Sequence, residues 1–149
     1  MTEATLVTSH TELLLFRIGG ELFALPLAAS EEAVEALAHE PLPGMPAGML
    51  GIARHRGRRL AVYAAAPVLG VECRGAEPVT LVVRADAGSI GLVVDDVEDV
   101  IRADLSALRA VPGPASTDPV LRGVLPWEGT LVAVCDPPAL VRACLGAKR

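Results

Sequence analysis

Two β-branched runs joined by a short turn constrain this chain more than any other feature. Residues 79–84 read VTLVVR and residues 89–94 read SIGLVV, on either side of the turn Asp86-Ala87-Gly88. β-Branched side chains favour extended backbone, and a short connection that contains glycine is typical of a β-hairpin. We therefore expect the chain to fold around at least one antiparallel pair of strands.

The same pattern recurs elsewhere in the chain. Further hairpins are predicted for residues 13–18 with 21–25 about Gly19-Gly20, for 49–53 with 60–63 about the polar turn 54–58, and for 121–125 with 130–134 about Glu128-Gly129. Asp136 and Pro137 then begin a short helix, and Gly146 is expected just past its end. Short strands, frequent turns and little helix predict an all-β barrel or sandwich with short helices.

Two segments have an ambiguous pattern. Residues 30–37 look helical locally, because Ser30 can cap the helix and Glu31 and Glu32 suit its positive N-terminus. Residues 95–101 fit either helical spacing or a continued strand. The residue pattern alone leaves the second segment open.

Length and composition predict one folding unit. The chain has 149 residues, of which 52% are hydrophobic and 21% charged, so it can bury enough surface to fold alone. Aromatic residues are few, so the core must consist mainly of Val, Leu, Ile and Ala. We expect a flexible tail at residues 1–12, a single domain at 13–145, and a C-terminal tail at 146–149.

Charge, thiols and hydropathy narrow the class of protein. A net charge of −5 argues against nucleic-acid binding, although the turn from Arg54 to Arg59 is a local basic exception. Cys73, Cys135 and Cys144 are widely spaced, which predicts buried free thiols rather than disulfides or a metal site. The start of the chain lacks the pattern of a secretory signal, and no apolar run is long enough to span a bilayer, so we expect a cytoplasmic protein without membrane insertion.

Clustered carboxylates raise a second hypothesis, a small metal-dependent hydrolase. It would use Asp95, Asp96 and His55, since hard cations bind clustered carboxylates. No calcium loop or phosphate-binding loop accompanies them, and His10 and His39 are not placed like general bases. We therefore expect an acidic strand face, with no catalytic residue, metal or cofactor. Trp127, in a polar turn, is expected to be partly buried against the neighbouring barrel.

Three segments in order resemble the CheW family, over residues 13–145. Residues 42–46 leading into 51–62 are similar to the family's proline loop and its "RG" hairpin. Residues 90–101, IGLVVDDVEDVI, are similar to "iGlvVDsVsdVl", and residues 121–124 with 131–136 are similar to "irGvakldgrlvilLDl". The order and spacing together make the resemblance fairly specific.

The resemblance implies a fold and a role. The fold would be two SH3-like five-stranded β-barrels sharing a hydrophobic core, with residues 31–37 at an edge strand and 97–101 also in a strand. The role would be a non-enzymatic adaptor that couples the cytoplasmic tip of a methyl-accepting chemoreceptor to the regulatory domain of a CheA-type histidine kinase.

The resemblance also implies two sets of binding residues. Arg56 falls on the arginine of the "RG" hairpin and would hold receptor helices in a groove. The apolar lining of that groove would be Ile52, Val62, Val93 and Val97. The kinase-facing edge corresponds to Ser30, Glu32 and Ala33.

This chain departs from the family pattern at the kinase-facing edge and at the start of the helix after the "RG" hairpin. Ser30 and Ala33 replace apolar anchors, which leaves a receptor-only protein that tunes the array as an alternative to a full coupler. Ala64 replaces the family's capping aspartate, so the helix that follows should be weaker by about 1 kcal/mol.

Overall fold

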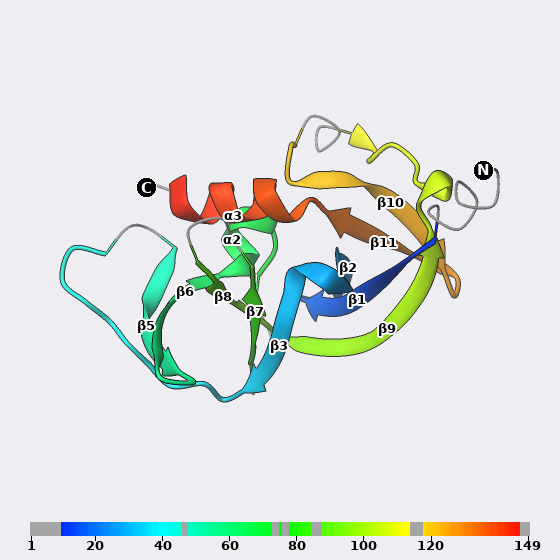
Figure 1. Cartoon of the computed structure of the whole chain (residues 1–149). Coiled ribbons are helices and arrows are strands. Elements are labelled where there is room, and N and C mark those ends of the chain that lie inside the picture. Colours follow the sequence, from blue (N-terminus) through cyan, green and yellow to red (C-terminus); the bar gives the residue numbers. More distant parts are fainter. Residues whose placement is uncertain are drawn as a thin grey trace.

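The computed structural model describes residues 10–45, 48–72, 75, 78–84, 88–113 and 118–146, most of which lie in strands (Figure 1). The strands are β1 (His10–Ile18), β2 (Glu21–Pro26), β3 (Ser30–Glu35), β4 (His39–Glu40), β5 (Met49–His55), β6 (Arg58–Ala64), β7 (Val79–Val83), β8 (Ile90–Val94), β9 (Asp96–Asp104), β10 (Leu121–Trp127) and β11 (Thr130–Cys135). The helices are α2 (Ala65–Leu69) and α3 (Pro137–Gly146), with 3₁₀ turns η1 (Leu27–Ala29) and η2 (Leu105–Ala107). The predicted all-β class with short helices is confirmed.

The strands form two sheets. Subdomain 1 has the strand order β10-β11-β2-β1-β9, and subdomain 2 has the order β3-β7-β8-β6-β5-β4. All four predicted hairpins are present, as β1–β2, β5–β6, β7–β8 and β10–β11. Subdomain 2 has one strand more than predicted, because the two-residue β4 pairs with the outer edge of β5.

The predicted shared core is confirmed, and β1 shows how it is built. Successive side chains of a strand point to opposite faces. Leu13 and Leu15 pack in a cluster made of subdomain 1 residues, whereas Phe16 and Ile18 join a cluster that also contains Leu81 and other residues of subdomain 2. Both faces of β1 are therefore buried, which explains why residues 13–16 are apolar without alternation.

The segment at residues 30–35 corrects the local helix prediction. It is strand β3, paired antiparallel with β7 at the edge of subdomain 2, as the family resemblance implied. Its residues alternate between half-buried and exposed, which is the period of a strand. Helix propensity is a weak preference, and hydrogen bonding to β7 overrides it. Residues 97–101 are likewise strand, within β9.

The two helices show the predicted difference in capping. The backbone N–H of Ala139 donates to Oδ2 of Asp136 at 3.2 Å, so α3 has its predicted N-cap. α2 begins after Ala64 with no side-chain cap. The helices contact each other beside the junction of the subdomains (Figure 1).

Three smaller predictions need correction. Residues 10–12, which were predicted to belong to the N-terminal tail, pair with β9 in strand β1. Gly146 is the last residue of α3 rather than the first beyond it, and residues 1–9 and 147–149 lie outside the described residues. Trp127 is half-buried, but against the cluster of its own subdomain rather than the neighbouring one, because its strand β10 belongs to that sheet.

Candidate functional site

The β5–β6 hairpin carries the positively charged side chains of residues 54–59. Its two-residue turn has φ 52° at Arg56 and φ 76° at Gly57. Positive φ at both central positions belongs to the hairpin turn whose twist matches that of the strands. Arg54 and Arg59 lie directly opposite each other, as do His55 and Arg58 one position nearer the turn. Side chains alternate along each strand, so the two pairs face opposite sides of the hairpin.

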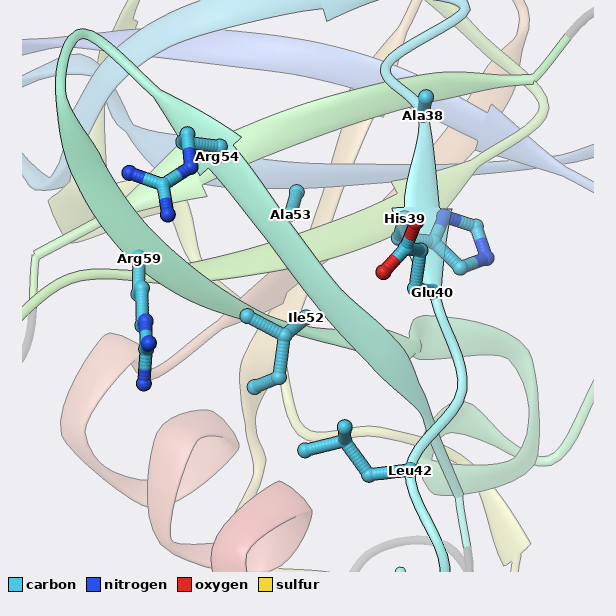
Figure 2. A pocket seen from close by; sticks show the side chains of 8 residues that line it. All are labelled: Ala38, His39, Glu40, Leu42, Ile52, Ala53, Arg54 and Arg59. Atoms are coloured by element: carbon cyan, nitrogen blue, oxygen red, sulfur yellow. The ribbon is translucent and has the colours of Figure 1, made fainter.

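The outer side of the hairpin borders a hollow of about 480 Å³ (Figure 2). Its lining combines apolar side chains with charged ones, from the segment around β4 and from the hairpin: Ala38, His39, Glu40, Leu42, Ile52, Ala53, Arg54 and Arg59. Leu42 is 48% exposed, which is unusual for a side chain of its size. The sequence reasoning did not identify this hollow.

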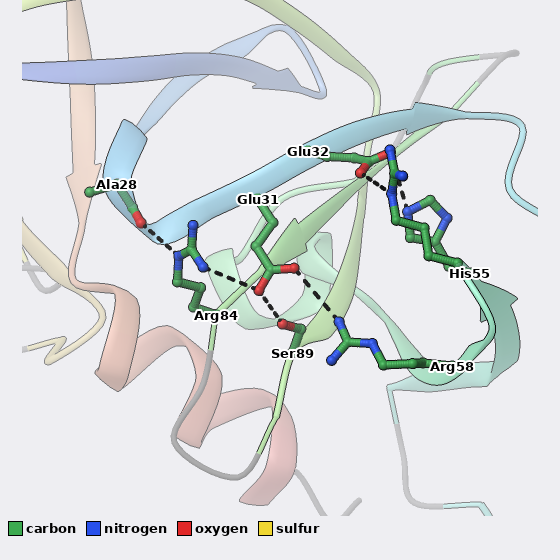
Figure 3. Close-up of polar contacts among 8 residues, drawn as sticks. Ala28, Glu31, Glu32, His55, Arg58, Arg84 and Ser89 are labelled. Carbon is green, nitrogen blue, oxygen red and sulfur yellow. Dashed lines mark hydrogen bonds and ion pairs between the residues drawn. The ribbon is translucent and has the colours of Figure 1, made fainter.

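At the turn, Arg56 forms a two-bonded ion pair with Glu32 of strand β3 (Figure 3). Nε of Arg56 donates to Oε1 of Glu32 at 2.9 Å, and Nη2 donates to Oε2 at 3.3 Å. Paired hydrogen bonds from a guanidinium to a carboxylate fix both distance and orientation. The Arg56 side chain is nevertheless 71% exposed, so it remains accessible to a partner.

His55 approaches the same carboxylate from β5. Its Nε2 atom lies 3.2 Å from Oε2 of Glu32, close enough for an ion pair when the ring is protonated. The hydrogen bond from Arg56 lowers the pKa of the Glu32 carboxyl, loss of solvation opposes the shift, and the contact with His55 adds to it. Glu32 is therefore held in its charged form between two basic groups.

The neighbouring Glu31 forms a second polar cluster (Figure 3). Oγ of Ser89 donates to its Oε2 at 2.6 Å, Nη1 of Arg84 lies 3.5 Å from the same oxygen, and Nη2 of Arg58 lies 3.9 Å from Oε1. A shift of register between Ser30 and Glu32 accompanies this arrangement. The irregularity explains how two consecutive glutamates contact the same side of subdomain 2.

The structure brings together two residues that the sequence assigned to different sites. Arg56 was predicted for receptor binding and Glu32 for kinase binding, yet they contact each other directly. On the same β3 edge, Ser30 is half-buried and Ala33 is exposed. No local pattern in the sequence indicates this contact, because the two residues are 24 positions apart.

The predicted apolar lining of the receptor groove is only partly accessible. Val62 is 0% exposed, so its assignment to a binding surface is wrong; its side chain points into the core of subdomain 2. Val93 is half-buried against that same core, and Val97 is half-buried against the shared core. Ile52 lines the hollow on the outer side of the hairpin.

The residues of the hydrolase hypothesis have separate partners. Oδ2 of Asp95 accepts a hydrogen bond from the backbone N–H of Gly19 at 2.7 Å, and Oδ1 of Asp96 accepts one from Val97 at 2.9 Å. His55 instead faces Glu32. In the described parts of the chain, His, Cys, Asp and Glu side chains form no group of three that could hold a metal ion. The geometry therefore gives the hydrolase hypothesis no support.

Two of the three cysteines are confirmed as buried free thiols. Cys135 is 0% exposed and Cys144 is 1% exposed. Burial raises the pKa of both thiols, that of Cys144 to about 11. Cys73 lies outside the described residues.

Fold and site together define a class of protein, a two-subdomain β scaffold whose charged features lie at strand edges and turns. Across the described residues, none of the helices is long and apolar enough to cross a membrane.

The chain belongs to the CheW-like domain family, whose model matches residues 12–144. It is 30% identical over 144 residues to "Chemotaxis protein CheW" of Rhizobium meliloti (strain 1021), covering 91% of this chain and 92% of that one. It is also 30% identical over 121 residues to "Protein PilI" of Pseudomonas aeruginosa, covering 75% and 67%. Among solved structures, the scaffolding protein TtCheW of Thermoanaerobacter tengcongensis superimposes with a TM-score of 0.79 at 22% identity, covering 87% of this chain and 86% of that one. The chain is thus a CheW-like chemotaxis adaptor.

Proposed function

We propose that this adaptor joins a methyl-accepting chemoreceptor to a CheA-type histidine kinase and performs no chemistry itself. The observation that carries the proposal is the two-bonded contact of Arg56 with Glu32. It ties the turn proposed for the receptor to the edge strand proposed for the kinase. A partner that engages either residue changes the surroundings of the other, which suits a protein that couples two partners. The predicted cytoplasmic location remains a prediction.

The proposed receptor surface is the exposed side of Arg56 together with partly exposed apolar side chains of the predicted set. Val93 and Val97 retain partial exposure, whereas the buried Val62 is left out and Ile52 instead lines the hollow on the outer side of the hairpin. Receptor tips are helical, and an arginine fork suits carboxylates on a helix.

The proposed kinase surface is the β3 edge, with Ser30, Glu32 and Ala33. An edge strand presents unpaired backbone groups that a partner can bind. However, Ser30 and Ala33 offer little apolar contact area. This observation favours a second candidate function, in which the protein binds the receptor alone and tunes the signalling array.

Calorimetry with separate receptor and kinase fragments tests both functions. Arg56→Glu should weaken receptor binding by about tenfold or more, because it turns a favourable contact with carboxylates into a repulsive one. Folding should be intact, since exposed substitutions cost little. Arg122→Glu on β10, also exposed, is the matched control and should bind normally.

Each outcome has a clear meaning. Binding of both fragments by the unmodified chain supports a full coupler, and binding of the receptor fragment alone supports the tuning function. Unchanged receptor affinity in Arg56→Glu would contradict the assigned receptor surface. Binding of neither fragment would contradict the proposed function as a whole.

A further inference from the structure

Arg54 and Arg59 form a pair of like charges without an ion-pair partner among the described residues. They are directly opposite on β5 and β6, and both are exposed. Like charges at directly opposite positions destabilise a sheet. Neither guanidinium has a carboxylate within ion-pair distance among the described residues, where the ion pairs of this region use Arg56, Arg58 and Arg84 instead. An acidic chain with net charge −5 thus holds two arginines opposite each other that make no ion pair within the described part of the fold.

Apolar side chains lie beside this pair of arginines. Ile52 precedes Arg54 on the same face of β5, and Leu42, 48% exposed, lies across the hollow from the hairpin (Figure 2). Ala38 and Ala53 complete the apolar part of the lining. Four apolar and four polar or charged side chains thus line a concave surface of about 480 Å³, which can receive both an apolar side chain and a charged group of a partner.

The charges that line the hollow indicate which kind of partner fits it. Glu40 is the one carboxylate among the described residues that line the hollow, so two arginines outnumber it. A guanidinium binds a carboxylate through paired hydrogen bonds, and Arg54 and Arg59 present two such groups beside Ile52. A nucleic acid fits less well, because its affinity requires many cations along a backbone, whereas the described lining of the hollow has two arginines.

We propose that this hollow binds an acidic segment of a partner protein, with two carboxylates on Arg54 and Arg59 and an apolar side chain between Leu42 and Ile52. The inference rests on the proposed function, because the partner it names is the kinase regulatory domain. β3 ends at Glu35 and Ala38 already lines the hollow, so the chain runs directly from the strand proposed for the kinase into the hollow. Electrostatic attraction at the hollow would add binding free energy for the kinase that the small side chains of Ser30 and Ala33 do not provide.

The test is calorimetry of the full chain with the kinase regulatory domain at low and high salt. The double variant R54E/R59E should weaken binding by about tenfold or more and should remove most of its salt dependence. The double variant R102E/R122E makes the same change in net charge on exposed positions of β9 and β10, and should bind like the unmodified chain. Thermal unfolding of both variants checks that they are folded.

A separate variant tests the apolar part. Leu42→Ser keeps all charges and should weaken binding of the kinase domain without altering receptor binding. Equal affinity of R54E/R59E and the unmodified chain would overturn the inference while leaving the proposed coupling function intact. Failure of the unmodified chain to bind the kinase domain at all would overturn the inference together with the kinase arm of the proposed function. An oligonucleotide shift that is lost in R54E/R59E would assign the patch to nucleic acid and overturn the inference.

Discussion

Arg56 and Glu32 hold the turn of the β5–β6 hairpin against strand β3, through two hydrogen bonds of 2.9 and 3.3 Å. β3 is one edge of the second sheet, and β5 is next to the opposite edge. The ion pair therefore joins two parts of subdomain 2, β3 and the β5–β6 turn, that backbone hydrogen bonds between neighbouring strands do not connect directly. Two features that the family resemblance treats as separate surfaces thus form one connected region.

This ion pair predicts a pH dependence of stability. Because Arg56 lowers the pKa of Glu32 in the folded chain, the contact stabilises the fold above the pKa of an unfolded glutamate, roughly 4.3. The stabilisation is lost as pH falls through the lower folded value. The melting temperature of the unmodified chain should exceed that of Glu32→Gln at pH 6, and the difference should shrink below about pH 4.

Glu35→Gln is the control for this prediction. Glu35 is an exposed carboxylate on the same strand, and it makes no ion pair among the described residues. Its removal should leave the pH profile of the unmodified chain nearly unchanged. A constant difference between Glu32→Gln and the unmodified chain from pH 7 to pH 3 would show that the ion pair contributes nothing to stability.

The shared core predicts that the two subdomains unfold together. Phe16 is 1% exposed and stacks on Phe23 with ring centroids 5.8 Å apart, in the cluster that joins both sheets. Phe16→Ala should cost about 3–5 kcal/mol. Trp127 fluorescence, which reports on subdomain 1, and far-UV circular dichroism should give one coincident transition. Val100→Ala, at a side chain 42% exposed, should cost far less. Two separate transitions in the unmodified chain would contradict the prediction.

The close approach of Gly51 to β4 predicts that a side chain at position 51 would disturb the hollow. Its φ is 155°, and a Cβ atom there would overlap the carbonyl oxygen of Glu40 on β4. Gly51→Ala should therefore displace β4 and destabilise the chain. Gly44→Ala is the matched control, because its φ is also positive but nothing lies within 4 Å of the added atom. Gly44→Ala should cost about 1 kcal/mol from backbone conformation alone, and Gly51→Ala clearly more. Equal denaturant midpoints for the two variants would rule out the steric constraint.

The buried thiols predict slow chemical modification. Burial raises the pKa of Cys144 to about 11 and that of Cys135 further, so both are protonated and shielded at pH 8. In a Cys73→Ser background, a thiol reagent at pH 8 should label neither residue in the native chain and both in denaturant. Rapid labelling of two thiols per chain without denaturant would show that this part of the core opens readily.

The sequence determined the elements whose signals are local. The hairpins follow from apolar strands on either side of turns such as Arg56-Gly57, and the start of α3 follows from Asp136. Such features depend on residues within a few positions of one another, so their patterns can be recognised directly. The resemblance to the family, rather than any local pattern, predicted that two β subdomains pack around a shared core.

Only the tertiary structure decided which side chains meet. Residues 30–35 became a strand because β7 lies beside them, against a helical local pattern. Val62 proved inaccessible because the interior of subdomain 2 closes over it, and Glu32 reached Arg56 across 24 positions. Burial and ion pairing depend on distances between segments far apart in the chain, and these distances exist only once both sheets have closed around their cores.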